Sequence, residues 1–215
     1  MGGVWGIVVA GGSGSRFGEL KQFLPLDGLP VAARAVAGCR SVCDSVVLVI
    51  PAGVASHDTH GADLVVVGGS TRAASVRAGL DAVAADASIV VVHDAARPLA
   101  RSELFRSVID ALASAAVDGA VCAVPVSDTI KRVTTDDGVS RVVHTLDRSQ
   151  LVSVQTPQGF RADVLRRAHE GAPDATDDAA LVEALGLTVV VVPGDPDNLK
   201  LTTPADLARA ERLVG

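Results

Sequence analysis

The chain has 215 residues, of which 48% are hydrophobic and only 2% aromatic, and its formal net charge is -6. This length and hydrophobic content suit one large domain over residues 1–215, with a core of small aliphatic side chains. The acidic balance and the lack of basic runs in the sequence argue against nucleic acid as a partner.

The cysteines and the amino-terminal sequence indicate the cellular compartment of the protein. Cys39, Cys43 and Cys122 form neither an even set nor paired CxxC modules, so we expect buried, reduced thiols. The opening MGGVWGIVVAGG lacks the basic region of a signal peptide, and no apolar run approaches membrane-spanning length. We therefore expect a cytoplasmic protein without a membrane partner.

Short valine-rich runs alternate with helix-like segments along the chain. The runs are continuously apolar, as in strands buried on both faces, and lie at residues 4–10, 45–51, 63–68, 88–94, 120–126 and 187–193. The predicted helices lie at residues 30–39, 71–85, 102–116, 161–170, 177–185 and 203–213. This alternation predicts an α/β fold with a mostly parallel central sheet, whose ligands lie beyond the carboxyl ends of the strands.

One segment departs from this alternation. Residues 129–145 alternate apolar and polar side chains on both sides of Asp137 and Gly138, a pair typical of tight turns. The pattern predicts a β-hairpin arm at about residues 129–147. Because an isolated hairpin is only marginally stable, we expect this arm to pack on a second subunit.

The first valine run ends in a glycine-rich loop, AGGSGSRFG, at residues 10–18. The dinucleotide fingerprint fails because Phe17 stands where the third glycine belongs, and no Gly-Lys-Ser/Thr completes a P-loop. The backbone N–H groups of this loop can still approach a nucleotide, with Arg16 and Lys21 reaching its phosphates. A tight turn with solvated cations is the alternative.

Lysine is rare in this chain. Only three of the nineteen basic residues are lysines, namely Lys21, Lys131 and Lys200. A compact ammonium and a planar guanidinium are not equivalent at a crowded phosphate, so a retained lysine indicates a site that needs a point charge. This observation favours the nucleotide interpretation of the first loop.

Polar residues follow several other predicted strands. Asp94, in HDAARP, ends a strand and could hold a metal or a ribose hydroxyl. The alternative is a helix N-cap with Arg97 as its ion partner. His93 is interpreted as a hydrogen-bonded core residue, and His57 and His60 lack a third ligand for a metal site.

Three further segments complete the set of polar loops. GGSTRAASV opens a helix in which Arg72 and Ser75 could grip a base or phosphate. VQTPQGF, at residues 154–160, and DNLKLTTPADL, at residues 197–207, are interpreted as polar strand ends or loops. Thr203 and Pro204 in the last segment indicate a capped helix start.

The segments AGGSGSRFG, GGSTRAASV, HDAARP, SDTIKR, TLDR, QTPQGF and DNLKLTTPADL follow one another across essentially the whole chain. In this order they resemble the motifs of the cytidylyltransferase family of the non-mevalonate isoprenoid pathway. The resemblance implies a single Rossmann-like nucleotidyltransferase domain with a protruding β-hairpin arm. It also implies that CTP and the sugar-alcohol phosphate 2-C-methyl-D-erythritol 4-phosphate react by direct in-line attack on the α-phosphorus, with Mg²⁺. Ser70 and Thr71 depart from the acidic or larger polar residues common in the family.

The resemblance further assigns roles to individual residues. The catalytic cations would be Arg16, Lys21, Arg148 and Lys200. CTP would be held by Ala10, Gly11, Gly12, Gly14, Gly68, Gly69, Ser75 and Asp94, with Asp94 also near the metal. The sugar-alcohol phosphate would be held by Arg97, Thr129, Arg148, Thr176 and Lys200. Thr129 and Arg148 belong to the arm, which in this family crosses to the neighbouring subunit of a homodimer.

Three other functions remain open from the sequence. A ribitol-5-phosphate cytidylyltransferase shares the loop, the arm and the DTIK and DR elements, although Ala96 in DAARP favours methylerythritol. A sugar-1-phosphate uridylyltransferase would differ in its nucleotide preference. A non-catalytic nucleotide-binding regulatory module needs the glycine loops but not the surplus of cations at strand ends.

Overall fold

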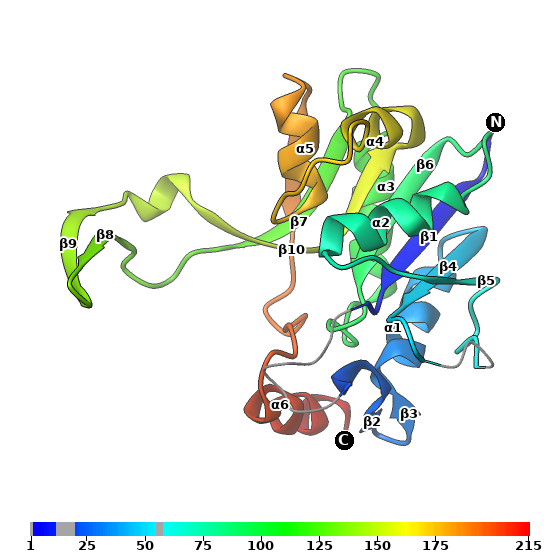
Figure 1. The fold of residues 1–215 in the computed structure, drawn as a ribbon, viewed down its shortest axis with the longest axis horizontal. Coiled ribbons are helices and arrows are strands. Elements are labelled where there is room, and N and C mark those ends of the chain that lie inside the picture. Colours follow the sequence, from blue (N-terminus) through cyan, green and yellow to red (C-terminus); the bar gives the residue numbers. More distant parts are fainter. Residues whose placement is uncertain (1, 12–19, 55–57) are drawn as a thin grey trace.

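The computed structural model describes residues 2–11, 20–54 and 58–215. Its centre is a seven-stranded sheet of order β11-β7-β10-β6-β1-β4-β5 (Figure 1). The strands are β1 (Val4–Val9), β4 (Ser45–Ile50), β5 (Leu64–Val67), β6 (Ile89–Asp94), β7 (Gly119–Pro125), β10 (Val152–Arg161) and β11 (Val189–Pro193). Within this sheet, β10 is antiparallel to both of its neighbours, and the other described strand pairs are parallel. The predicted α/β fold with a mostly parallel sheet is confirmed.

Helices cover both faces of this sheet. The helices on its faces are α1 (Val31–Arg40), α2 (Arg72–Asp81), α3 (Ser102–Ala111), α4 (Ala162–Ala168) and α5 (Asp178–Ala184). The carboxyl-terminal helix, α6 (Pro204–Val214), packs in a separate cluster. Side chains of α1 and α3 pack on one face, and those of α2, α4 and α5 pack on the other. Alternate residues of one strand, such as Ile7 and Val8, therefore face different helix layers and are both fully buried. Burial on both faces explains why the strand sequences are continuously apolar.

The helix ends follow from capping groups. Thr203 forms the capping box of α6, as its sequence indicated. Helix α3 ends at Ala111, earlier than predicted, where the Arg161 guanidinium donates to the carbonyl oxygens of Leu112 and Ser114 at 3.1 and 2.8 Å. These bonds satisfy carbonyl groups that the helix itself leaves open.

Short elements complete the body beside the sheet. They are the 3-10 turn η1 (Lys21–Phe23) and the two-residue strands β2 (Pro25–Leu26) and β3 (Leu29–Pro30). Leu26 and Leu201 are fully buried with Ala210 of α6 in a small separate cluster. This cluster holds the carboxyl-terminal helix beside β2, and Leu201 anchors the loop that leads into α6.

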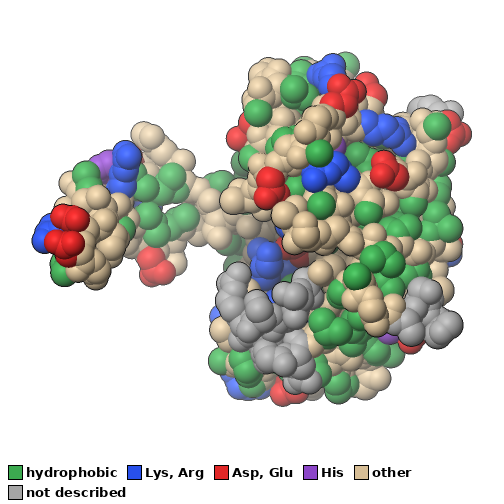
Figure 2. All heavy atoms as spheres, in the orientation of Figure 1, with side chains coloured by type: hydrophobic (Ala, Val, Ile, Leu, Met, Phe, Trp, Pro, Cys, Tyr) green, Lys and Arg blue, Asp and Glu red, His purple; other side chains and the backbone are tan. Residues whose placement is uncertain are grey.

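The predicted hairpin is confirmed and projects far from the sheet (Figure 1). It consists of β8 (Lys131–Asp136) and β9 (Val139–Thr145), followed by the 3-10 turn η2 (Arg148–Gln150). Asp137 and Gly138 have φ values of 48° and 74°, as a two-residue hairpin turn requires. Hydrophobic side chains lie exposed among the charged ones on this arm (Figure 2), with Val142 63% and Val143 56% exposed.

Strand β10 is the main difference from the sequence prediction, which treated residues 154–160 as polar strand-end or loop residues. Its first three residues are exposed, whereas Gln155 to Phe160 are buried between β6 and β7. Pro157 lies where the pairing with β7 shifts register, between Val154 and Gln158, so its missing N–H interrupts no regular ladder. A polar central strand of this kind has no apolar run by which to predict it.

Two smaller predictions concern cysteines and membranes. The three cysteines are free and buried, as expected. Among the helices of the described residues, none is long and apolar enough to cross a membrane.

Candidate active site

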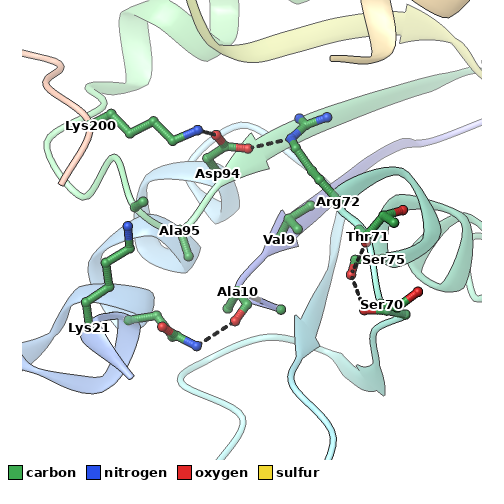
Figure 3. A pocket seen from close by; sticks show the side chains of 14 residues that line it. Val9, Ala10, Lys21, Ser70, Thr71, Arg72, Ser75, Asp94, Ala95 and Lys200 are labelled. Atoms are coloured by element: carbon green, nitrogen blue, oxygen red, sulfur yellow. Dashed lines mark hydrogen bonds and ion pairs between the residues drawn. The ribbon is translucent and has the colours of Figure 1, made fainter. Parts of the chain in front are cut away.

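A cavity of about 510 Å³ lies at the carboxyl ends of β1 and β6 (Figure 3). Its wall is formed by the end of β1, η1, the turn that opens α2, the end of β6 and the loop before α6. The lining residues are Val9, Ala10, Gly11, Lys21, Gln22, Gly69, Ser70, Thr71, Arg72, Ser75, Asp94, Ala95, Ala96 and Lys200. This is the edge of the sheet at which the sequence predicts ligands to bind.

Ser75 explains two of the glycines near this wall. A Cβ atom on Gly11 would lie 2.8 Å from Ser75 Oγ, and one on Gly68 would lie 2.6 Å from it. The Ser75 hydroxyl is buried and donates to the carbonyl oxygen of Thr71 at 2.9 Å. The two glycine turns therefore approach α2 too closely for any larger residue, which brings their backbone to the cavity wall.

A chain of ion pairs and hydrogen bonds begins at the wall of this cavity (Figure 3). Asp94 receives Arg72 Nε at 3.0 Å on Oδ1 and Lys200 Nζ at 2.7 Å on Oδ2. Arg72 continues the chain through Nη1, which lies 2.8 Å from Asp178 Oδ2. His169 Nε2 completes it at 3.0 Å from Asp178 Oδ1. The chain joins β6, the start of α2, the start of α5 and the loop before α6.

These pairs fix the charge of Asp94. Burial alone would raise the pKa of the Asp94 carboxyl, but the charges of Arg72 and Lys200 outweigh it and hold the pKa well below its usual range. Burial would likewise lower the pKa of Arg72, and its two carboxylate neighbours reverse that effect. The alternative in which Asp94 pairs with Arg97 is wrong, because its carboxylate binds Arg72 and Lys200 instead.

Asp94 is also the residue assigned to Mg²⁺ from the sequence. Within the described ranges, no cluster of three or more His, Cys, Asp or Glu side chains could enclose a metal ion. Magnesium is commonly held by one or two carboxylates, with waters and substrate phosphates as its other ligands. A carboxylate that already accepts two hydrogen bonds keeps further lone-pair directions. Asp94 therefore fits a site shared with a nucleotide, and not a metal cage built by protein alone.

His93 lies beneath this site and is fully buried. Its Nε2 lies 3.1 Å from the carbonyl oxygen of Arg97, which can only accept, so Nε2 carries the proton. Burial lowers the pKa of His93 to about 4, so the ring is neutral and Nδ1 accepts from the Thr156 hydroxyl at 3.2 Å. Thr156 Oγ1 in turn accepts from the backbone N–H of Asp94 at 3.0 Å. As interpreted from the sequence, His93 is a hydrogen-bonded core residue.

A second cavity of about 210 Å³ adjoins the first. It is lined by Arg72, Asp94, Arg97, Val154, Gln155, Thr156, Gln158, Thr176, Asp177 and Lys200. Arg72, Asp94 and Lys200 line both cavities and thus form the boundary between them. Arg97 is held by its Nη1, which donates to the carbonyl oxygen of Asn198 at 2.6 Å. Two ligands could therefore meet at one row of charges.

The structure brings most of the predicted site residues together. Ala10, Gly11, Lys21, Gly69, Ser75, Asp94 and Lys200 line the first cavity, with Gly68 packed behind Ser75. Arg97, Thr176 and Lys200 line the second cavity. Lys21 Nζ donates to the carbonyl oxygen of Leu201, which joins η1 to the loop before α6. Gly12, Gly14 and Arg16 lie outside the described residues.

Two predicted residues lie elsewhere. Thr129 and Arg148 are exposed and belong to the arm, and neither lines either cavity. The Arg148 guanidinium donates to the carbonyl oxygen of Ser127 at the base of the arm. Within one chain, the arm residues and the body residues are therefore not assembled into one site.

The sequence did not predict two residues of the candidate site, Asp178 and Gln158, and gave a third, Arg72, too small a role. Arg72 is expected from the sequence only as a grip for a base or phosphate, yet it is one of the two ion partners of Asp94. Asp178 is 106 residues away from Arg72 in sequence, and Gln158 lies in the strand that the sequence does not predict. Only Arg72 has a usable signal, because it opens a helix directly after a predicted strand and glycine pair.

This sheet, with a glycine-walled and cation-bearing cavity at its strand ends, defines an α/β nucleotidyltransferase. The family model described as 2-C-methyl-D-erythritol 4-phosphate cytidylyltransferase matches residues 4–215. The chain belongs to this family.

Individual relatives agree with that assignment. The chain is 45% identical to the 2-C-methyl-D-erythritol 4-phosphate cytidylyltransferase of Nocardia farcinica, with 99% of this chain and 94% of that protein covered. It is 46% identical to the bifunctional enzyme IspD/IspF of Anaeromyxobacter dehalogenans over 98% of this chain, but spans only 57% of that longer protein. The crystal structure of the cytidylyltransferase from Thermus thermophilus matches with a TM-score of 0.81 at 33% identity, covering 97% of both chains.

Proposed function

We propose that this chain joins CTP to 2-C-methyl-D-erythritol 4-phosphate, giving 4-diphosphocytidyl-2-C-methyl-D-erythritol and pyrophosphate. The observation that carries the proposal is the pair of adjoining cavities that share Arg72, Asp94 and Lys200. The larger cavity has the glycine-walled form suited to a nucleotide, and the smaller one combines cations with neutral polar groups. A phosphate held in each would meet at the shared boundary.

The reaction is a direct displacement at phosphorus. An oxygen of the sugar-alcohol phosphate forms a bond to the α-phosphorus of CTP, and the bond from that phosphorus to the bridging oxygen of pyrophosphate breaks. The reacting groups are both anionic, and charge grows on the α-phosphate oxygens and on the departing pyrophosphate. Holding both phosphates in line between fixed cations lowers this barrier without a covalent enzyme intermediate.

Basic side chains of the first cavity supply those fixed charges. Lys200 stands at the boundary and is oriented by its 2.7 Å pair with Asp94. Lys21 lines the same side of the first cavity, where its Nζ donates to the carbonyl oxygen of Leu201. We assign transition-state stabilisation to Lys21 and Lys200, together with Arg16, for which the sequence resemblance is the only support. Arg97 and Thr176 are assigned to the sugar-alcohol phosphate in the second cavity.

Mg²⁺ is proposed to bind at Asp94 together with the phosphates of CTP. When bound, the metal withdraws electron density from the phosphate oxygens and neutralises part of their charge. The residues around it have a separate task. Arg72 and Lys200 hold the Asp94 carboxylate ionised and fixed in direction, so it is ready to share a cation with the nucleotide.

We further propose that the site is completed by a homodimer. Thr129 and Arg148 line neither cavity of their own chain, and the arm that carries them exposes Val133, Val139, Val142 and Val143. Exposed apolar groups on a projecting hairpin favour packing against another molecule. A second copy would cover these valines and bring Thr129 and Arg148 to the second cavity of the other subunit. The cytoplasmic location stays a prediction from the sequence.

A pyrophosphate-release assay tests the function. CTP, UTP and ATP are each combined with methylerythritol phosphate and with ribitol 5-phosphate, in the presence of Mg²⁺. We expect release with CTP and methylerythritol phosphate far above every other pair. Preferred turnover of ribitol 5-phosphate would assign the chain to that reaction instead, and nucleotide binding without release from any pair would indicate a regulatory module.

A further inference from the structure

Gln158 occupies an unusual place in the second cavity. It lies in the middle of β10, where its backbone pairs with Val92 of β6 on one side and Val121 of β7 on the other. The residue is only 1% exposed and is one of those that line the second cavity. A polar side chain on such a rigid, buried backbone position can present one atom to a ligand with little freedom to move.

The direction of the Gln158 amide follows from its neighbour. Gln158 Nε2 donates to Asp177 Oδ2 at 3.0 Å, so the NH₂ group faces Asp177. Asp177 is itself held in place, because its Oδ1 accepts from the backbone N–H of Ala180 at 3.1 Å as the N-cap of α5. The Gln158 carbonyl oxygen, Oε1, must therefore be the atom that remains for another partner.

No such partner exists among the described residues. Gln158 Oε1 is buried and accepts no hydrogen bond within the described chain. Two buried donors of the same cavity, Arg72 Nη2 and Arg97 Nε, also lack acceptors there. These three buried atoms belong to residues that line the second cavity, so the unpaired groups beside it are two guanidinium donors and one amide acceptor.

The guanidinium donors and the amide acceptor need hydrogen-bond partners of opposite kinds, which one ligand can carry on different groups. A phosphate dianion offers acceptors to guanidinium groups, but it has no proton to donate to an amide oxygen. A hydroxyl group has one. Arg72 lines both cavities and lies at their boundary, whereas Gln158 lines the second cavity and not the first. If the phosphate of a ligand lies at the boundary, the remainder of that molecule therefore lies near Gln158.

We propose that Gln158 is a specificity-determining residue whose Oε1 accepts a hydrogen bond from one hydroxyl of the sugar-alcohol chain, with Asp177 as the positioning residue that aims it. The inference rests on the proposed function, in which the phosphate of the same molecule lies at the boundary of the two cavities. It identifies what the buried amide adds, namely a preference for a hydroxylated chain. An acceptor that lacked this hydroxyl would leave Oε1 buried and unpaired, which is the arrangement that rejects analogues most strongly.

A substrate-by-variant cycle tests the assignment. The Gln158→Met variant keeps the length and volume of the side chain but removes the acceptor. It is compared with the parent on methylerythritol phosphate and on its three monodeoxy analogues, with kcat/KM from pyrophosphate release. We expect Gln158→Met to lower kcat/KM for the full substrate by about 5- to 150-fold, the effect of leaving one buried hydrogen-bonding group unpaired. CTP affinity measured without the second substrate is expected to stay the same.

The decisive result is loss of additivity. For one monodeoxy analogue, the parent should already be slowed by a similar factor, and Gln158→Met should slow it no further, because the same hydrogen bond is missing in both cases. Equal effects of Gln158→Met on all four substrates would overturn the inference while leaving the proposed function intact. Absence of turnover by the parent would overturn the proposed function and this inference with it.

A second measurement needs no variant. In a crystal structure of the parent with methylerythritol phosphate and a non-reactive CTP analogue, a substrate hydroxyl should lie within hydrogen-bonding distance of Gln158 Oε1. A water molecule on Oε1, with every substrate hydroxyl bound elsewhere, would contradict the assignment even if Gln158→Met failed to fold.

Discussion

Two inactive variants of this chain should restore each other if the arm completes the site of a second copy. Arg148→Ala removes a cation of the arm, and Lys200→Ala removes a cation shared by both cavities of the body. Each variant alone should lose about 3–4 kcal/mol of transition-state stabilisation, or a hundredfold or more in kcat. In a mixed dimer, however, one site combines an intact body with an intact arm, and the other site lacks both cations.

The size of the recovery follows from this geometry. Equal amounts of two variants that exchange subunits freely give about one half mixed dimers, and each has one intact site out of two. The mixture should therefore reach about one quarter of the parent activity per subunit. If Arg148 served the site of its own chain, every site of a mixed dimer would still lack one cation, and the activity would remain near zero.

The assay is pyrophosphate release after the subunits are mixed, dissociated and reassociated, with native mass spectrometry to count mixed dimers. Arg141→Ala is the matched control, because Arg141 is another exposed arm arginine and lies 3.9 Å from Asp136, an ion partner within the arm. We expect this variant to keep the parent activity by itself. Mixed dimers present in the expected amount but without recovered activity would refute the exchanged arm.

Three further predictions concern the site within one chain. Burial holds the pKa of His93 near 4 in the folded chain, against an ordinary value near 6.5. At a pH between these two values, the unfolded chain therefore binds a proton on His93 that the folded chain excludes. The free energy of unfolding should therefore fall by roughly 3 kcal/mol as the pH drops from about 6.5 to about 4, as measured by denaturant titration. His93→Gln should remove this part of the pH dependence. If the variant had the same pH dependence as the parent, a neutral buried ring would be contradicted. Gly68→Ala should weaken CTP binding by about tenfold in calorimetry, since its Cβ would lie 2.6 Å from Ser75 Oγ; unchanged affinity would mean that the turn is not tightly packed. Lys21→Ala should lower kcat about a hundredfold or more, with a smaller change in CTP affinity. Arg106→Ala, at an exposed position, is the control. Equal losses of kcat and CTP affinity would indicate that Lys21 only binds the nucleotide.

The parallel strands were predictable because burial on both faces leaves a local signal. Val46 to Val49 of β4 are fully buried, and a strand in this environment has to be apolar at every position. The hairpin was predictable for a similar reason, since the Asp137–Gly138 turn and alternating polarity are also local. Each of these features is complete within a short stretch of sequence.

Strand β10 could not be predicted because its residues serve the cavity instead of the core. Gln155, Thr156 and Gln158 are buried on a central strand and line the second cavity. Local rules for strands fail at positions whose side chains are selected for a site. The family resemblance includes QTPQGF as a motif, but the motif alone does not indicate an antiparallel strand at the centre of the sheet.

The ion pairs needed the tertiary structure. Asp94 and Lys200 were both predicted to belong to the site, yet their direct contact spans 106 residues and has no signature in the sequence. Arg72 and Asp178 are separated by an equal distance along the chain. The roles of Gly12, Gly14 and Arg16, and the organisation of residues 1–215 as one domain, stay predictions.

The course of β10 has a consequence for how the family can change its arm. The same strand begins at the exposed Val152, passes the register shift between Val154 and Gln158, and continues to the fully buried Phe160. One extra residue in the buried part of β10 would exchange the side chains that face the second cavity for those that face away from it. Insertions and deletions that alter the reach of the arm are therefore expected at its tip, around Asp137 and Gly138, where length can vary without disturbing the register of the sheet.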